Sequence, residues 1–249
     1  MAEYTNVEKP FLEKLRQAHW HVIDQGQGIP VDPAKSLRSS FGEVALKAEF
    51  MRSVGELNRW ATPKQLEYCY ERILLQGNKK LLEANKEVFR MLRKVITLLD
   101  KNTLTGEENP TIMLVDFNPR QTGRNSFIAM NQFRVDTPTT AKLFIIPDIV
   151  CFVNGMPWIV IECKDLYTAE QLSDAFTQIR RYSNQRDEDP YATLGGKESL
   201  FYTNLFNVIT HGTEARFGAI RSEFDYYNNW IDIFPEKYKT VETGNGGKH

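Results

Sequence analysis

Several features that would place this chain in a specialised class are missing from its sequence. No run of about 18 or more apolar residues occurs, so no membrane span is expected. The N-terminal stretch MAEYTNVEKPFLEKL is charged and lacks the apolar segment of a secretory signal. Cysteine is scarce, and Cys69, Cys151 and Cys163 show no CxxC spacing. These absences favour a cytoplasmic protein with reduced thiols over a disulfide framework or a zinc site.

An excess of positive charge is also absent. The 249 residues include 31 Lys and Arg and 32 Asp and Glu, which gives a formal net charge of −1. A protein that holds nucleic acid unaided through many phosphate contacts usually carries a basic excess. Any DNA contact should therefore be local, or depend on partners that hold the substrate. No GxxxxGK[ST] phosphate loop occurs either, so no ATP-driven motor is expected within this chain.

The first part of the chain predicts helices and the second part predicts strands. Residues 6–20 carry apolar residues at spacings of three and four, which predicts a helix. Residues 41–99 predict two or three helices, with a start at Thr62-Pro63 and a break at Gly77-Asn78. Short β-branched and aromatic runs then predict strands, with one helix among them at about 168–184. The runs are TIMLVDF, SFIAMNQFRV, FIIPDIVCFV, WIVIECK, FNVITHG and ARFGAI.

The stretch PDIVCFVNGMPWIVIECKD, residues 147–165, predicts a hairpin with charged groups at its open end. Its two nearly continuous apolar runs are typical of strands covered on both sides, at the centre of a sheet. An ionised carboxylate there is costly unless it is paired or coordinates a metal. Glu162 and Lys164 share a face and could neutralise each other, but this pairing leaves Asp148 unexplained.

The turn of this hairpin decides whether the two carboxylates meet. A two-residue Asn154-Gly155 turn would pair Val153 with Met156 and put Asp148 on the face opposite Glu162. A three-residue loop, or a bulge with a left-handed Gly155, would put Asp148 directly across from Glu162, with Cβ atoms roughly 5 Å apart. We predict the odd-length turn.

Carboxylates and an ammonium so placed suit the hydrolysis of phosphodiesters. Asp148 and Glu162, with the backbone carbonyl of Cys163, would hold Mg²⁺, for which Mn²⁺ could substitute, and several waters. The metal would polarise the phosphate and lower the pKa of an attacking water. Lys164 would orient that water or stabilise the charge that develops on the phosphate.

Pro147-Asp148 followed by Glu162-Cys163-Lys164 resembles the PD-(D/E)xK nuclease motif, with Cys163 in a position that is commonly aliphatic. Gln178 and Tyr182 match the QxxxY element of the RecB-like branch, and their spacing on a helix lets both face one site. Longer stretches resemble the N-terminal nuclease region of type I restriction endonuclease R subunits. They are LLEANKEVFRML, NSFIAMNQFRV, the hairpin itself and GTEARFGAI.

The resemblance implies a fold and an activity. The fold is α/β, a mixed sheet of the αβββαβ type flanked by helices, in a single nuclease domain of residues 1–240. A helical subregion lies at about 41–100 and a flexible tail at 241–249. The implied activity is Mg²⁺-dependent cutting of double-stranded DNA. A glutamate of the first helix should lie near the metal; Glu8 is the best candidate, although Glu3 or Glu13 could be mistaken for it.

The resemblance also implies partners outside this chain. The family's R subunit carries two ATP-using motor domains, which are absent from this sequence. It works with methylation (M) and specificity (S) subunits, using S-adenosylmethionine.

Each motif also has a plainer interpretation. Asp148 could cap a strand end beside a structural Glu162–Lys164 pair, and Gln178 and Tyr182 could be ordinary residues of an amphipathic helix. Arg180 and Arg181 either contact phosphate near the scissile bond or form a solvated helix face. The alternative for the whole chain is a catalytically silent nuclease-fold module for DNA binding or subunit docking.

Overall fold

A computed structural model describes residues 3–118, 122–138, 143–165, 171–185 and 195–230. The predicted tail at 241–249, and the first residues of the helix predicted from about 168, lie outside these ranges. Within the described residues, no helix is long and apolar enough to cross a membrane.

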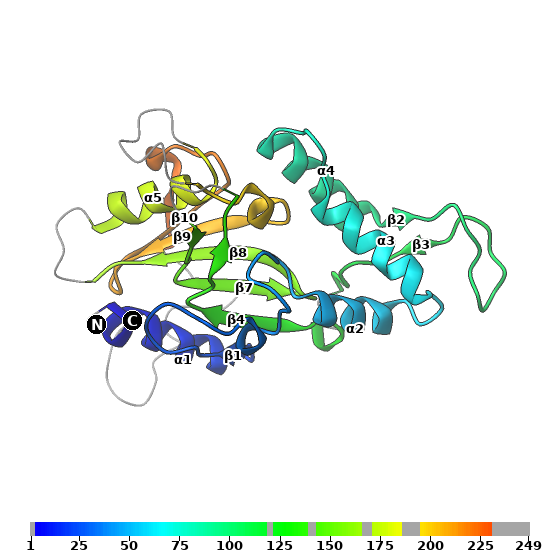
Figure 1. Cartoon of the computed structure of the whole chain (residues 1–249), viewed down its shortest axis with the longest axis horizontal. Coiled ribbons are helices and arrows are strands. Elements are labelled where there is room, and N and C mark those ends of the chain that lie inside the picture. The colour runs from blue at the N-terminus through cyan, green and yellow to red at the C-terminus, as the bar shows by residue number, and fades with distance from the viewer. Residues whose placement is uncertain (1–2, 119–121, 139–142, 166–170, 186–194, 231–249) are drawn as a thin grey trace.

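A seven-stranded mixed sheet forms the centre of the molecule (Figure 1). Its strands lie in the order β1-β4-β7-β8-β9-β10-β11, so the predicted hairpin of β7 and β8 is central, as expected. The strands are β1 (His21–Ile23), β4 (Phe127–Asn131), β7 (Ile149–Val153), β8 (Met156–Cys163), β9 (Phe206–Thr210), β10 (Ala215–Gly218) and β11 (Asn228–Asn229).

Helices α1 and α5 lie on opposite faces of the sheet (Figure 1). Ile149 and Cys151 of β7 pack in the cluster that contains Leu12 of α1 (Lys9–Gln17). Val150 and Phe152, the alternate residues, pack with the apolar side of α5 (Gln171–Tyr182). Because successive strand residues point to opposite faces, a strand buried on both sides must be apolar almost throughout.

The order of the elements confirms the predicted fold class. After α1, strands β4, β7 and β8 form an antiparallel series, and α5 then leads to β9, which pairs parallel to β8. This is the expected αβββαβ order. Strand β1, which pairs parallel to β4, was not predicted, since its three residues are too few to show a periodic pattern.

The predicted helical subregion is present as three helices: α2 (Lys47–Leu57), α3 (Pro63–Leu74) and α4 (Leu81–Lys94). It extends to one side of the sheet, together with the short strands β2 (Ile96–Thr97) and β3 (Thr111–Ile112) (Figure 1). The predicted start of α3 is confirmed. Thr62 and Gln65 form a reciprocal capping box, and Pro63 occupies the first turn.

Two of the predicted strands are interrupted. The run at 126–135 divides at Gln132, which has a left-handed backbone (φ 48°), into β4 and the short β5 (Val135–Asp136). The run at 144–153 divides at Pro147, which has no N–H to donate to a ladder, into β6 (Phe144–Ile145) and β7. The N-terminal helix also differs from a regular α-helix, because it begins with a π-helical segment, η1 (Tyr4–Glu8).

The hairpin turn differs from the prediction, but the register at its open end does not. The turn has two residues, Asn154 and Gly155, both with positive φ, so the predicted odd-length turn is wrong. Val153 pairs with Met156 and Phe152 with Pro157, whereas Cys151 pairs with Ile159. Trp158 is therefore an extra residue, a bulge that shifts the register by one.

The shifted register brings the charged ends of the strands together. Ile149 pairs with Ile161, so the next step along the hairpin puts Asp148 opposite Glu162. The bulge at Trp158 therefore produces the register that we predicted from an odd-length turn. Without it, Asp148 would face the other side of the sheet.

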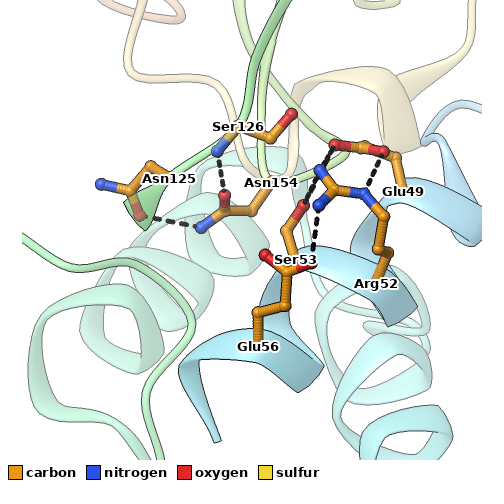
Figure 2. Close-up of polar contacts among 7 residues, drawn as sticks. All are labelled: Glu49, Arg52, Ser53, Glu56, Asn125, Ser126 and Asn154. Atoms are coloured by element: carbon orange, nitrogen blue, oxygen red, sulfur yellow. Dashed lines mark hydrogen bonds and ion pairs between the residues drawn. The ribbon is translucent and has the colours of Figure 1, made fainter. Parts of the chain in front are cut away.

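The turn end of the hairpin is anchored on the helical subregion. The carbonyl of Gly155 accepts a hydrogen bond from Leu46 N at 2.8 Å, just before α2. The Asn154 amide accepts from Ser126 N at 2.7 Å and donates to Asn125 Oδ1 at 3.0 Å (Figure 2). Figure 2 also shows the polar side chains of α2 on the facing helix. The hairpin is therefore held at the end remote from its charged groups.

Candidate active site

The predicted charged residues converge at the open end of the β7–β8 hairpin. Lys164 Nζ donates to Glu162 Oε1 at 2.9 Å and to the Cys163 carbonyl at 3.0 Å. Both acceptors are predicted metal ligands. The ammonium therefore contacts two of the oxygen atoms that we expect a divalent cation to bind.

Asp148 is tied to both neighbouring strands. Its Oδ2 atom accepts a hydrogen bond from Cys163 N at 2.7 Å, and its backbone carbonyl accepts one from Gln132 N at 2.8 Å. Burial and the nearby charge of Glu162 raise the pKa of Asp148 well above its ordinary value. The hydrogen bond from Cys163 N agrees with the plainer interpretation of Asp148 as a cap for a strand end, but the carboxyl group of Asp148 also interacts with that of Glu162.

Glu162 lies in the sheet with no exposed surface. Its Oε1 atom is paired with Lys164, but among the described residues no hydrogen-bond donor meets its buried Oε2 atom. Burial raises the pKa of Glu162, and its carboxyl group interacts with that of Asp148. A proton or a cation between the two carboxyl groups would satisfy the orphaned oxygen atom.

The N-terminal helix adds further carboxylates to this end of the sheet. Glu8 is only 2% exposed and accepts hydrogen bonds from the Gln132 amide at 3.1 and 3.2 Å. One carboxylate oxygen each from Glu3, Glu8 and Asp148 lie within 4.8 Å of one another. Glu13, by contrast, is exposed and pairs with Arg16. Glu8 and Glu3 therefore lie beside Asp148, whereas the position of Glu8 near a metal stays a prediction.

Carboxyl groups outnumber positively charged groups in this site. Glu3, Glu8 and Asp148 lie close to one another, and Glu162 pairs with the ammonium of Lys164. Burial raises the pKa of Glu8 to about 7. Burial alone would lower the pKa of Lys164, but the charges of Glu162 and Asp148 outweigh it and raise that pKa above its ordinary value. Oxygen donors in this number and proximity fit a hard divalent cation.

Gln178 and Tyr182 contact each other on α5. Gln178 Nε2 donates to the Tyr182 hydroxyl at 2.6 Å, and this hydroxyl donates to the carbonyl of Ile146 at 2.9 Å. Tyr182 is buried, and Ile146 lies two residues before Asp148. Through these contacts the two side chains support the segment that leads into Asp148. The catalytic role expected for both residues stays a prediction.

Arg180 and Arg181 lie near the end of α5 and are half-buried. Arg180 is 3.7 Å from Glu223 and lies against the ring of Phe176, and Arg181 lies against the ring of Tyr182. Neither residue therefore belongs to a fully solvated helix face, and contact with phosphate stays a prediction for both.

The sequence of this chain matches one known family over most of its length. Residues 1–226 match the family described as Type I restriction enzyme R protein N terminus. The chain belongs to this family. The matched residues include all four carboxylates and Lys164.

Two curated relatives of this R-protein N terminus are similar along nearly its whole length. The Type I restriction enzyme HindI endonuclease subunit of Haemophilus influenzae is 27% identical over 247 residues, which are 97% of this chain and 21% of that protein. The Putative type I restriction enzyme MjaIXP endonuclease subunit of Methanocaldococcus jannaschii is 24% identical over 243 residues, again 97% of this chain and 22% of that protein. The chain thus spans about a fifth of the length of these relatives.

Two further residues lie at this end of the sheet without having been assigned a role from the sequence. Glu3 precedes the apolar stripe of the first helix and was named only as a residue that could be mistaken for Glu8. The amide of Gln132 contacts Glu8. The sequence signal for Gln132 was its place in NSFIAMNQFRV, a stretch that resembles the family, whereas Glu3 lies in none of those stretches.

Proposed function

We propose that this chain is the Mg²⁺-dependent endonuclease part of a type I restriction R subunit, which hydrolyses phosphodiester bonds of double-stranded DNA. One observation carries the proposal. The bulge at Trp158 puts Asp148 opposite Glu162, so that two buried carboxylates and Lys164 share the edge of the sheet that Glu8 also reaches. The motif belongs to the PD-(D/E)xK type, in its RecB-like branch with QxxxY.

The residues present fit a divalent metal. Asp148, Glu162, Glu8 and the Cys163 carbonyl would hold it, with Glu3 as an additional oxygen donor. The orphaned Oε2 atom of Glu162 supports this assignment, because a buried carboxylate oxygen without a donor is costly unless it binds a cation. When bound, Mg²⁺ would supply Lewis-acid polarisation of the phosphate and a lowered pKa for a bound water.

Lys164 acts as a charged donor in this proposal. Its raised pKa keeps the ammonium protonated, so it can stabilise negative charge on a phosphate oxygen or orient a water, but does not abstract a proton. Tyr182 and Gln178 hold the chain before Asp148 through the carbonyl of Ile146.

The substrate would be delivered by other parts of a complex. The net charge of −1 gives the chain little general attraction for DNA. We therefore propose that M and S subunits, with S-adenosylmethionine, select the DNA, and that ATP-using motor domains of the full subunit bring it to this site. Arg180 and Arg181 are the candidates for contact with its backbone.

The proposal is tested by DNA cleavage in the assembled complex. The full R subunit with Lys164→Ala should assemble with M and S and hydrolyse ATP as the parent does, but should not cut DNA. Lys101→Ala serves as the control, since Lys101 belongs to an exposed pair with Glu108 far along the chain from the site. Cleavage by the Lys164→Ala complex at the parent rate would refute the assignment.

Calorimetric titration of Mn²⁺ separates this proposal from a catalytically silent module. Binding to the parent chain, with loss in Glu162→Ala, is expected for a metal-dependent site. Absence of binding in the parent, together with absence of cleavage by the parent complex, would favour the silent module.

A further inference from the structure

Gln132 has a backbone conformation that its residue type rarely adopts. Its φ of 48° lies in the left-handed region, which glycine and asparagine tolerate better than a long side chain does. Besides the local hydrogen bond from Arg134 N to its carbonyl, two contacts with distant parts of the chain hold it there. Its N–H donates to the Asp148 carbonyl at 2.8 Å, and its own carbonyl accepts from Gln25 Nε2 at 3.2 Å. Backbone strain of this kind persists only where the surroundings impose it, and it is common at functional sites.

The side chain of Gln132 uses this conformation to reach Glu8. Its Nε2 atom lies 3.2 Å from Oε1 and 3.1 Å from Oε2 of the Glu8 carboxylate. The neighbouring Asn131, fully buried at the end of β4, adds a longer contact of 3.5 Å to Oε2. Within the described residues, Glu8 forms no ion pair, so amide groups and not cations orient this buried carboxylate.

An amide is chemically suited to hold a carboxylate that must still bind a cation. A Lys or Arg at this position would neutralise Glu8 and compete with the metal. The amide donates hydrogen bonds but carries no net charge, and a carboxylate has about four lone-pair directions, so others stay free. Hydrogen-bonded partners of ligating carboxylates set their orientation in the same way in metal sites generally.

We propose that Gln132 is a positioning residue, which links the backbone of Asp148 to the side chain of Glu8 and so presets the distance between two metal ligands from distant parts of the chain. This inference rests on the proposed metal site. It explains the strained residue: glycine would relieve the backbone but lose the amide, and asparagine would fit the left-handed region better but is one methylene shorter.

The test is calorimetric titration of Mn²⁺ into the chain and its Gln132→Gly variant. Because glycine removes the side chain and relieves the backbone, the variant should fold, which circular dichroism and urea unfolding check. We expect its affinity for Mn²⁺ to fall by roughly 10- to 100-fold. Gln65→Ala is the matched control, since Gln65 also donates its amide to a carboxylate, that of Asp100 at 2.7 Å, but in the helical subregion. It should lower stability without changing the affinity.

A double variant distinguishes positioning from direct ligation. With Glu8→Ala already present, Gln132→Gly should weaken Mn²⁺ binding no further, because its effect passes through Glu8. An equal additional loss in that background, or parent-like affinity of Gln132→Gly alone, would overturn the inference while leaving the metal site intact. Absence of Mn²⁺ binding by the parent chain would overturn both the inference and the proposed metal site.

Discussion

Replacing Lys164 by methionine should lower the unfolding free energy of the chain, because the buried carboxylate of Glu162 loses its positively charged partner. The ammonium is the only positive group that contacts Glu162 among the described residues, and Glu162 has no exposed surface. Methionine preserves much of the apolar stem but leaves the buried carboxylate without its partner. The variant protein must then either tolerate a buried charge or protonate Glu162.

The response that costs less free energy determines how much unfolding free energy the variant loses. Removing one partner of a buried ion pair costs about 3–5 kcal/mol if the other stays charged. Protonating a carboxyl group of ordinary pKa 4.5 costs about 1.4 kcal/mol for each pH unit above that value. This amounts to about 2 kcal/mol at pH 6 and about 5 kcal/mol at pH 8. Lys164→Met should therefore lose about 2 kcal/mol of unfolding free energy at pH 6 and about 4 kcal/mol at pH 8.

The sign of this pH dependence follows from proton binding. Burial raises the pKa of Glu162 in the folded chain, so the folded variant holds a proton that the unfolded chain releases above pH 4.5. The folded state then binds more protons than the unfolded state, and the unfolding free energy falls as the pH rises. Its deficit relative to the parent should grow from pH 6 to pH 8.

Urea unfolding of parent and variant at pH 6 and pH 8, with EDTA present, measures this deficit. Lys101→Met is the control: its pair with Glu108 is 68% and 73% exposed, so the change should stay within about 0.5 kcal/mol at both pH values. In separate samples without EDTA, Mn²⁺ should still bind Lys164→Met, because the carboxylates remain, and should add about 2.7 kcal/mol to its unfolding free energy at a hundredfold excess over Kd. A deficit below about 1 kcal/mol at both pH values, or one independent of pH, would refute the reasoning.

Three further outcomes follow from contacts in the structure. Tyr182→Phe should lose about 1–3 kcal/mol of unfolding free energy in urea, because the part-buried Ile146 carbonyl loses the donor that the buried Tyr182 provides; an unchanged midpoint would contradict this role. Gly155→Ala should lose more than about 1–2 kcal/mol of unfolding free energy, since the position has φ +78° and a Cβ atom would lie 2.5 Å from the Leu46 carbonyl oxygen. Stability equal to that of the parent would show that this turn relaxes freely. Mn²⁺ affinity should rise from pH 6 to pH 8, because Glu8, whose pKa burial raises to about 7, must lose its proton to bind a cation; calorimetry in buffers of different ionisation enthalpy would detect that proton, and a pH-independent affinity would contradict this.

Local signals in the sequence were sufficient for much of the fold. The apolar runs of the hairpin predicted two central strands, and Thr62-Pro63 predicted the start of α3, because periodicity and capping act over a few residues. Apolar runs gave wrong strand boundaries where a single residue interrupts a strand. Pro147 breaks a ladder for a reason visible in sequence, whereas Gln132 adopts a left-handed backbone only because Asp148 and Gln25 hold it.

The sequence by itself determined the kinds of chemical groups in the site and the strands that carry them. Asp148, Glu162 and Lys164 were recognisable because charges at the end of an apolar hairpin demand partners. The tertiary structure alone decided how these groups meet. The bulge at Trp158, and not the turn, sets the register, since a one-residue shift costs little locally and is chosen by packing on both faces of the sheet. Glu3 and Glu8 approach Asp148 only because α1 covers one of those faces, which no local pattern in the sequence encodes.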